Sequence, residues 1–293
     1  MKGTGQAVAH GAVTIINAFA TGKGGAMGID LWTRSRVSLK ERHKGVSGFV
    51  NSDPRESSEL IVTVVEKTLE HYGYAGKIGG EVVTTSNLPI AVGLKSSSAA
   101  ANATALATAA ALGEQPDEDV LLEIGVESSL QSGVSLTGAL DDSYASYHGG
   151  IVLADNLGRK VEKVFDIPRD VRLLLLVPQR KRYTGTLNKS QFKPIQRIVD
   201  IAYREALAGN IWDAMTLNGF AYSTILQEDL GPAIAALRAG AVGAGLTGKG
   251  PTIVSVLERS GSEQVKQALS KFPGKVVETA PNQTEALIED VTL

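Results

Sequence analysis

The chain has 293 residues, enough for one large or two ordinary domains with a substantial hydrophobic core. Its 43% hydrophobic and 20% charged residues are typical of a globular protein, and a formal net charge of -2 excludes a general attraction for nucleic acid or anionic membranes. The absence of cysteine excludes disulfides, zinc–thiolate sites and cysteine nucleophiles. No apolar run reaches membrane-spanning length and no signal peptide is evident, so we expect a cytoplasmic protein.

The first part of the chain alternates strand-forming runs with clusters of glycine. We predict two strands and a glycine-rich loop between them, at residues 5–17, 29–41 and 22–28 respectively. A helix with Ser57 or Ser58 as its N-cap follows, and then a strand that ends in a turn at Pro89. The strongest helix comes next, because nine of the thirteen residues from Ala99 to Ala111 are alanine, the residue with the highest helix propensity.

The rest of the chain continues this alternation. A helix with Pro116 in its first turn is followed by a loop or short helix around Asp141 and Asp142, and by a strand. A change of domain is expected near residues 160–170, where the strand from Val171 opens a new pattern. We then predict three helices, a glycine loop, a strand, a helix and a strand, with the helices at about 190–208, 210–227 and 231–240. This order indicates an α+β fold without internal repeats.

Two glycine-rich stretches are candidates for a phosphate-binding loop. The run GAGLTGKG, from Gly243 to Gly250, nearly matches the P-loop pattern, but Gly250 stands where a magnesium-binding hydroxyl is needed. A P-loop also connects a strand to a following helix, whereas this run follows a helix and leads into a strand. We therefore reject the P-loop interpretation.

The run GLKSSSAAA, from Gly93 to Ala101, has the required order of strand, loop and helix. Backbone N–H groups in the first turn of a helix have no intrahelical acceptor, and the helix dipole is positive there, so an anion fits this end. The hydroxyls of Ser96 to Ser98 can donate to phosphate or bind magnesium, and Lys95 adds positive charge. The alternative is that Ser96 or Ser97 only caps the helix.

Glu127 shares a predicted helix face with Val120, Ile124 and Gln131, because these residues follow a +4, +3, +4 spacing. A carboxylate on a partly apolar face is costly unless a cation such as magnesium pairs with it. The alternative is a slightly rotated helix that leaves Glu127 in water.

Asp141 and Asp142 precede the paired glycines Gly149 and Gly150. Adjacent carboxylates often mark only a polar turn, but small and aromatic residues flank this pair, which favours a lined site. An aspartate beside a transferring phosphoryl group can accept the proton of the attacking hydroxyl and orient it.

Taken together, these motifs resemble the GHMP kinases, named for galactokinase, homoserine kinase, mevalonate kinase and phosphomevalonate kinase. Three features carry the resemblance: a phosphate loop of the form P-x-x-x-G-L-[GS]-S-S-A, a late glycine-rich motif, and an aspartate separated by six residues from paired glycines. They correspond here to Pro89–Ala99, to GLTGKGPT from Gly245, and to Asp142. The runs GAVTIINAFATGKGGAMGIDL, GALDDSYASYHGG and GLTGKGPT further resemble the archaeal-type shikimate kinases of this superfamily.

The resemblance implies a two-domain GHMP kinase fold. The N-terminal half, residues 1–165, is expected to resemble domain 2 of ribosomal protein S5 and to bind ATP, and the C-terminal half, residues 166–293, is expected to be ferredoxin-like. The implied reaction is MgATP-dependent phosphorylation of the 3-hydroxyl of shikimate. Ser97 and Glu127 are implied to hold Mg²⁺, and Asp142 to act as the base. The residues implied to wrap the ATP phosphates are Pro89, Ile90, Ala91, Val92, Gly93, Leu94, Lys95, Ser96, Ser97, Ser98 and Ala99.

The chain departs from the family pattern in places. Ala12 and the pair Ala18-Phe19 stand where mevalonate kinases have a lysine and a Glu-His pair, and Lys95 and Lys249 replace small or polar residues. Shikimate carries a carboxylate and three hydroxyls, so its site needs a cation and several hydrogen-bonding groups. The candidates are Asn17, Thr21, Lys23, Asp141, Arg182 (or its neighbour Arg180) and Lys249.

Two alternatives remain open from the sequence. Another small-molecule GHMP kinase, for homoserine or pantoate, keeps the phosphate site and changes the acceptor pocket. A non-catalytic sensor of nucleotide or metabolite keeps the fold, but it has no need of Glu127 and Asp142. Neither nucleic acid nor membrane is expected as a partner, and the sequence gives no oligomeric state.

Overall fold

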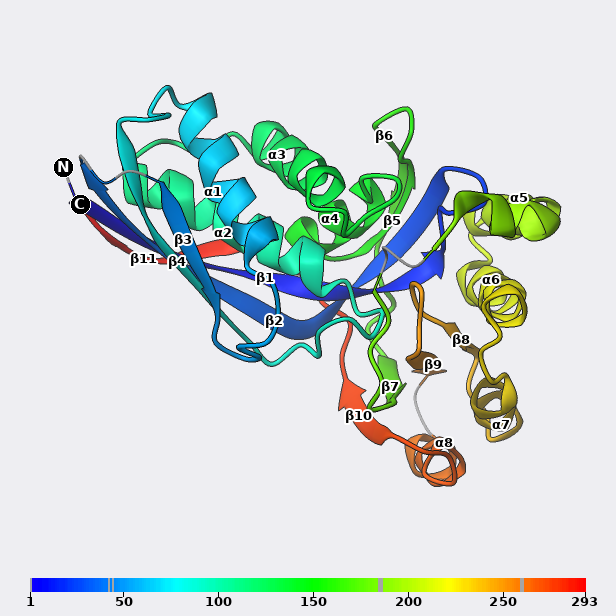
Figure 1. Cartoon of the computed structure of the whole chain (residues 1–293). Coiled ribbons are helices and arrows are strands. Elements are labelled where there is room, and N and C mark those ends of the chain that lie inside the picture. The colour runs from blue at the N-terminus through cyan, green and yellow to red at the C-terminus, as the bar shows by residue number, and fades with distance from the viewer. Residues whose placement is uncertain (1, 42, 44, 184–186, 259–260) are drawn as a thin grey trace.

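The computed structural model describes residues 2–41, 43, 45–183, 187–258 and 261–293. They form two units, each a sheet with helices, which lie side by side (Figure 1). The first unit contains β1 (Lys2–Ile16), β2 (Lys23–Glu41), β3 (Val46–Val50), α1 (Glu59–His71), β4 (Ile78–Ser86), α2 (Ser96–Leu112), α3 (Glu118–Gln131), α4 (Leu140–His148), β5 (Ile151–Asp155), β6 (Lys160–Phe165) and β11 (Leu287–Thr292). The second contains β7 (Val171–Val177), the 3-10 helix η2 (Lys189–Ile195), α5 (Gln196–Ala208), α6 (Ile211–Leu226), α7 (Gly231–Arg238), β8 (Gly243–Leu246), β9 (Ile253–Glu258), α8 (Ser262–Leu269) and β10 (Lys275–Thr279).

The first sheet has seven strands in the order β11-β1-β2-β4-β3, with β5 and β6 continuing from one end of β2. The 19-residue β2 serves two neighbours, since its first residues pair with β5 and its later residues with β4. Helices α1 to α4 cover one face of this sheet (Figure 1). The last strand, β11, returns from the second unit to pair with β1, so both chain ends lie together.

Helix α2 is the central helix of the first unit and is buried on nearly all sides. Its alanines let it lie directly on β1, where a Cβ at Gly3 or Gly5 would come within 1.8 or 2.2 Å of a carbonyl oxygen of α2. A helix that is apolar all round is stable only inside a protein, which explains why the alanine run needs this position.

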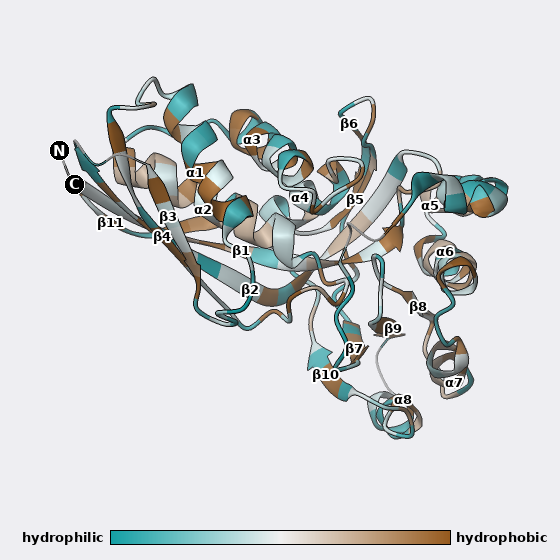
Figure 2. Ribbon diagram, in the orientation of Figure 1, coloured by the Kyte–Doolittle hydropathy of each residue, from teal (hydrophilic) through white to brown (hydrophobic). Residues whose placement is uncertain are grey.

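The second sheet has the order β10-β7-β9-β8, with helices before and after the β8–β9 hairpin. This is the ferredoxin-like arrangement that the resemblance predicted. A hydrophobic core joins this unit to the ends of β1 and β2, through buried residues such as Ile15, Met27, Leu94 and Leu173. Figure 2 shows hydrophobic strands at this junction, whereas α5 and α8 carry both hydrophilic and hydrophobic residues.

The α+β class is confirmed, and several element boundaries differ from the prediction. The glycine-rich segment 22–28 is not a loop but mostly the start of β2, and Pro116 lies outside α3, whose N-cap is Asp117. Residues 243–246 form β8, so GAGLTGKG runs from a strand into a hairpin turn; no helix follows it, and the P-loop interpretation remains excluded. The division at residue 165 stays a prediction. None of the described helices is long and apolar enough to cross a membrane.

Candidate active site

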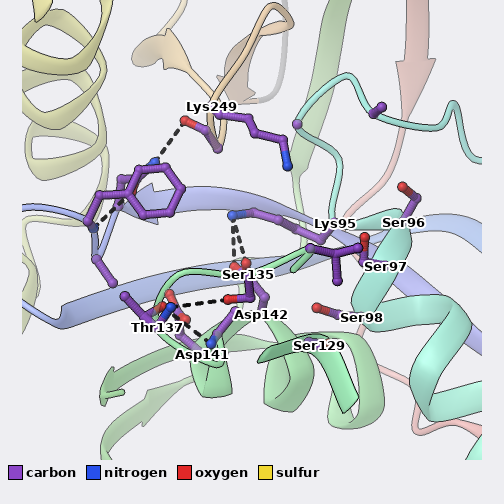
Figure 3. Close-up of a pocket in the computed structure, with 18 residues that line it drawn as sticks. Lys95, Ser96, Ser97, Ser98, Ser129, Ser135, Thr137, Asp141, Asp142 and Lys249 are labelled. Carbon is purple, nitrogen blue, oxygen red and sulfur yellow. Dashed lines mark hydrogen bonds and ion pairs between the residues drawn. The ribbon is translucent and has the colours of Figure 1, made fainter. Parts of the chain in front are cut away.

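The N-terminus of α2 forms the centre of the site. Its first intrahelical hydrogen bond runs from the N–H of Ala99 to the carbonyl of Lys95, at 3.1 Å. The N–H groups of Ser96, Ser97 and Ser98 therefore have no acceptor within the helix. Their side chains line a cavity at this end, so donors and the positive end of the helix dipole face the same space (Figure 3).

Close contact with the β8–β9 turn fixes the loop before α2. Gly93 has φ +93°, and a Cβ there would lie 2.2 Å from the carbonyl oxygen of Thr247. The hydroxyl of Thr247 donates to the carbonyl of Gly93 at 2.9 Å, and the N–H of Thr252 donates to the carbonyl of Val92 at 3.3 Å. Only glycine fits such an approach at this φ. The two glycine-rich motifs singled out in the sequence are thus in direct contact.

Two cavities meet at the N-terminus of α2. The first, of about 90 Å³, contains the charged residues Asp141, Asp142 and Lys95. The second, of about 410 Å³, is more apolar and is lined in part by Val50, Leu60, Ile61, Ile90 and Ala100. Both cavities are lined by Ala91, Ser96, Ser97, Val134 and Lys249. A ligand that extends from one cavity into the other must pass the free N–H groups of α2.

Asp142 forms an ion pair with Lys95 across the first cavity. The ammonium of Lys95 lies 2.8 Å from Oδ1 and 3.0 Å from Oδ2 of Asp142, and the two side chains are only 11% and 14% exposed. Asp142 lies in the first turn of α4, and Ala139, the N-cap of that helix, has φ +56°. Ala91 and Lys95 also have positive φ values, of +58° and +62°. Such strain in non-glycine residues often accompanies functional sites.

Asp141 is almost fully buried, although it lines the first cavity together with Asp142. Its backbone N–H donates to the side chain of Asn156 at 3.0 Å, and its carboxylate packs on Gly24, where a Cβ would lie 2.2 Å from Oδ2. Burial and the negative charge of Asp142 raise the pKa of Asp141, and Lys95 opposes the rise. Asp142 is therefore the carboxylate that is better placed to meet a ligand.

Lys249 lies in the β8–β9 turn of the second unit and lines both cavities. Figure 3 shows its side chain reaching toward the pair of Lys95 and Asp142. Burial and the charge of Lys95 lower the pKa of Lys249 to about 8, against the opposing effect of Asp142. At neutral pH Lys249 still carries a charge, which an anionic ligand would stabilise.

Of the two predicted magnesium ligands, the structure brings Ser97 to the first cavity but not Glu127. The side chain of Glu127 is 45% exposed and pairs with Lys67 of α1 at 3.2 Å. Ser129, two residues further along α3, lines the cavity instead. The rotated-helix alternative therefore describes Glu127, because the buried face of α3 includes Gly125, Ser128 and Ser129 and leaves Glu127 in water.

The oxygens at the first cavity nevertheless suit Mg²⁺. They comprise the carboxylate of Asp142 and the hydroxyls of Ser97, Ser129 and Thr137. Among the described residues, no cluster of three or more acidic, histidine or cysteine side chains forms a cage for a metal. Magnesium that arrives with phosphates needs only one or two protein ligands, since water and phosphate oxygens supply the rest. The donor set therefore fits a nucleotide-bound ion rather than a resident one.

The predicted acceptor-binding residues divide into two groups. Asn17, Asp141 and Lys249 line the first cavity. The amide of Asn17 is already engaged, because Nδ2 donates to the carbonyl of Gly248 at 2.8 Å and Oδ1 accepts from the N–H of Phe19 at 3.1 Å. Asn17 therefore holds the β8–β9 turn in place.

Thr21, Lys23 and Arg182 do not line either cavity. The hydroxyl of Thr21 bonds to the backbone of Lys23, and the ammonium of Lys23 lies 3.5 Å from Glu162. Arg182 pairs with the buried Glu228 at 2.7 Å, and Arg180 pairs with the same carboxylate. A buried carboxylate requires cationic partners, so these arginines have a structural role.

Sequence reasoning missed the end of α3 and the segment between α3 and α4. Ser129 at the end of α3, with Ser135 and Thr137 after it, lines the first cavity, and Ser132 and Gly133 line the second. The run SSLQSGVSLTG, rich in hydroxyl side chains, was the available signal. Short polar runs between helices usually form ordinary loops, so this signal is weak in a sequence.

Comparison with known proteins agrees with this geometry. The family profile described as GHMP kinases N terminal domain matches residues 59–150, and that described as GHMP kinases C terminal matches residues 201–275. The chain belongs to the GHMP kinases, and it is an ATP-dependent small-molecule kinase.

Among GHMP kinases, the chain is similar over nearly its whole length to curated shikimate kinases. The chain is 41% identical over 288 residues to the shikimate kinase of Methanosarcina acetivorans, covering 97% of this chain and 96% of that one. It is 42% identical over 283 residues to the shikimate kinase of Thermococcus kodakarensis, covering 94% and 98%. The homoserine kinase structure from Cytophaga hutchinsonii covers 98% of this chain and 97% of its own, with a TM-score of 0.74 and 18% identity, which supports the fold alone.

Proposed function

We propose that this protein is a shikimate kinase, which transfers the γ-phosphoryl group of MgATP to the 3-hydroxyl of shikimate. The observation that carries the proposal is the position of Asp142, in a small polar cavity that shares the N-terminus of α2 with a larger apolar one. The similarity to curated shikimate kinases over nearly the whole chain supports the choice of acceptor. The cytoplasm, where ATP is abundant, is the location we propose with it.

In this proposal the nucleotide extends between the two cavities. The adenosine occupies the apolar second cavity, against Leu60, Ile61 and Ile90. The triphosphate runs along the N–H groups of Ser96 to Ser98, where the helix dipole favours negative charge. Lys249, at the junction, contributes positive charge from the second unit.

Magnesium would be held by the phosphates with Ser97, and with Ser129 in the place predicted for Glu127. When bound, the ion offsets negative charge on the phosphates. The protein's own residues position the two substrates and exclude water from the small cavity.

Shikimate occupies the first cavity with its 3-hydroxyl toward Asp142. The hydroxyl oxygen forms the new bond to phosphorus while the bond from phosphorus to the β–γ bridging oxygen breaks. The hydroxyl proton passes to the carboxylate of Asp142, which leaves shikimate 3-phosphate and ADP. Ser135 and Thr137 offer hydroxyls to the other alcohol groups.

A panel of acceptors tests the proposal. The purified protein is assayed with MgATP and each of shikimate, homoserine, mevalonate and pantoate, following ADP release and identifying the product by phosphorus NMR. We expect phosphorylation of shikimate at the 3-position. Turnover only with homoserine or pantoate would show that another GHMP kinase keeps the same phosphate site. Nucleotide binding without turnover of any acceptor would indicate a sensor.

A further inference from the structure

Lys95 places a long charged side chain at a buried position with a left-handed backbone. It is the N-cap of α2, it has φ +62°, and its side chain is 11% exposed. A left-handed conformation costs a non-glycine residue about 1 kcal/mol, so glycine or asparagine would fit this backbone more easily. Its long side chain also loses rotamer freedom in the pocket. These costs indicate that the ammonium group, rather than the backbone, is what this position supplies.

The ammonium lies where negative charge accumulates. Asp142 is its direct partner at 2.8 and 3.0 Å, and Asp141 lies behind that carboxylate. The first turn of α2 follows Lys95 directly, so a phosphate bound there lies beside the same ammonium. Lysine has three N–H donors. One of them donates to Oδ2 of Asp142 at 3.0 Å, while Oδ1 lies 2.8 Å away as an ion-pair contact, so donors remain for a phosphoryl oxygen.

We propose that Lys95 is a positioning residue for phosphoryl transfer. Its ammonium group orients Asp142 toward the acceptor hydroxyl, and it places positive charge between this carboxylate and the transferring phosphoryl group. The inference rests on the proposed function, since it takes Asp142 as the base. Without Lys95, the carboxylate would repel the phosphates and turn away from them. Lys249 comes from the second unit, whereas Lys95 directly precedes the first turn of α2 and lies 2.8 Å from Oδ1 of Asp142.

Five variants test this role by steady-state kinetics with ATP and shikimate. In Lys95→Met, kcat is expected to fall about 100-fold while KM for shikimate changes less than about threefold, as for loss of a group that acts mainly in the transition state. Lys95→Arg is expected to recover at least about tenfold of that loss. Lys95→Met with Asp142→Asn should be no slower than Asp142→Asn alone, because paired residues are not additive. Lys67→Met is the matched control, since it breaks the Lys67–Glu127 pair on α1 and α3, outside the site.

The titration of Lys249 provides a readout that needs no turnover. It is measured by acetic anhydride labelling of Lys249 between pH 6 and 11, with mass spectrometry. The groups that face Lys249 in the first cavity are Lys95, Asp142 and Asp141, and those in the second are Arg55, Glu56 and Tyr183. In wild type the midpoint is expected near pH 8. In Lys95→Met it should rise, because a neighbouring positive charge has gone.

The outcomes separate the inference from the proposed function. If wild type does not phosphorylate shikimate, the proposed function fails. If wild type does so and Lys95→Met keeps kcat within about threefold, or Lys95→Arg is no faster than Lys95→Met, the role of Lys95 fails while the function stands. An unchanged Lys249 midpoint in Lys95→Met would contradict the placement of the two ammonium groups.

Discussion

Two adjacent carboxylates at the start of α4 have different surroundings. Asp141 is 4% exposed and packs on Gly24, whereas Asp142 pairs with Lys95 at the cavity. Asp142→Asn is therefore expected to lower kcat by about 1,000-fold, the usual scale for loss of a general base, with nucleotide affinity changed less than about threefold. Single-turnover rates and nucleotide titration measure the two effects separately.

Asp141→Asn is the matched comparison. Burial raises the pKa of Asp141, so a neutral amide of the same shape costs little, and kcat is expected to stay within about tenfold of wild type. If Asp141→Asn were the slower variant, the base would have been assigned to the wrong carboxylate.

Lys249 is expected to reduce stability at neutral pH. Its folded pKa of about 8 lies below the ordinary 10.5, so the folded protein binds fewer protons than the unfolded chain between these values. The contribution of Lys249 to the free energy of unfolding therefore rises as the pH increases from about 8 to 10.5. It is lowest below about pH 8. Lys249→Met should raise the free energy of unfolding by about 1–3 kcal/mol at pH 7, with most of this gain lost near pH 10.5.

Urea denaturation at the two pH values measures this difference, and a Lys249→Met variant less stable than wild type at pH 7 would contradict it. Turnover should fall in the same variant, because the charge that costs stability lies at the proposed phosphate site.

At the residue scale the sequence predicted the positions that carry strong local motifs. Ser97, Asp142 and Lys249 lie at the cavities because each belongs to a motif of defined spacing. Lys23 and Arg182 were chosen for charge alone, and each has a carboxylate partner elsewhere that no local pattern reveals.

At the element scale, the contact between the phosphate loop and the β8–β9 turn decides the shape of the site. Gly93→Ala is expected to lower the free energy of unfolding by about 2–4 kcal/mol, from the left-handed φ together with a clash against Thr247. Nucleotide affinity should fall as well, because the loop must shift.

Gly76→Ala is the control for the conformational cost of placing alanine at a positive φ. Gly76 has φ +71°, but a Cβ there would meet nothing within 4 Å, so only the conformational cost of about 1 kcal/mol remains. Denaturation of the two variants side by side measures the contact, and equal losses would show that the contact adds nothing.

Helix α2 was predictable because alanine dominates it, while the orientation of α3 was not. Helix α3 buries Gly125, Ser128 and Ser129 beside its leucines, and such small residues look polar in a sequence. The prediction therefore chose a face that included Glu127. In the same way Gly24 and Gly25 suggested a loop, although they belong to β2 and are small because Asp141 and Leu153 pack on them.

At the scale of the whole molecule, the chain passes between the two units twice, after β6 and after β10, and both units contribute to one site. After β10 the chain leaves the second unit, and β11 pairs with β1 in the first. No local pattern in the sequence indicated this pairing. Lys181, after β7, pairs with Asp53 at 2.7 Å and with Glu56 beside the second cavity, and the hydroxyl of Tyr183 donates to Glu56 at 2.8 Å. No local pattern in the sequence predicts these long-range contacts.

The most direct test of the account is a crystal structure with a non-hydrolysable ATP analogue, magnesium and shikimate. We expect the triphosphate against the N–H groups of Ser96 to Ser98, the adenosine in the cavity lined by Leu60 and Ile90, and the shikimate 3-hydroxyl within hydrogen-bonding distance of Asp142. A nucleotide bound away from α2, or Asp142 directed away from both the hydroxyl and the γ-phosphoryl group, would contradict the account.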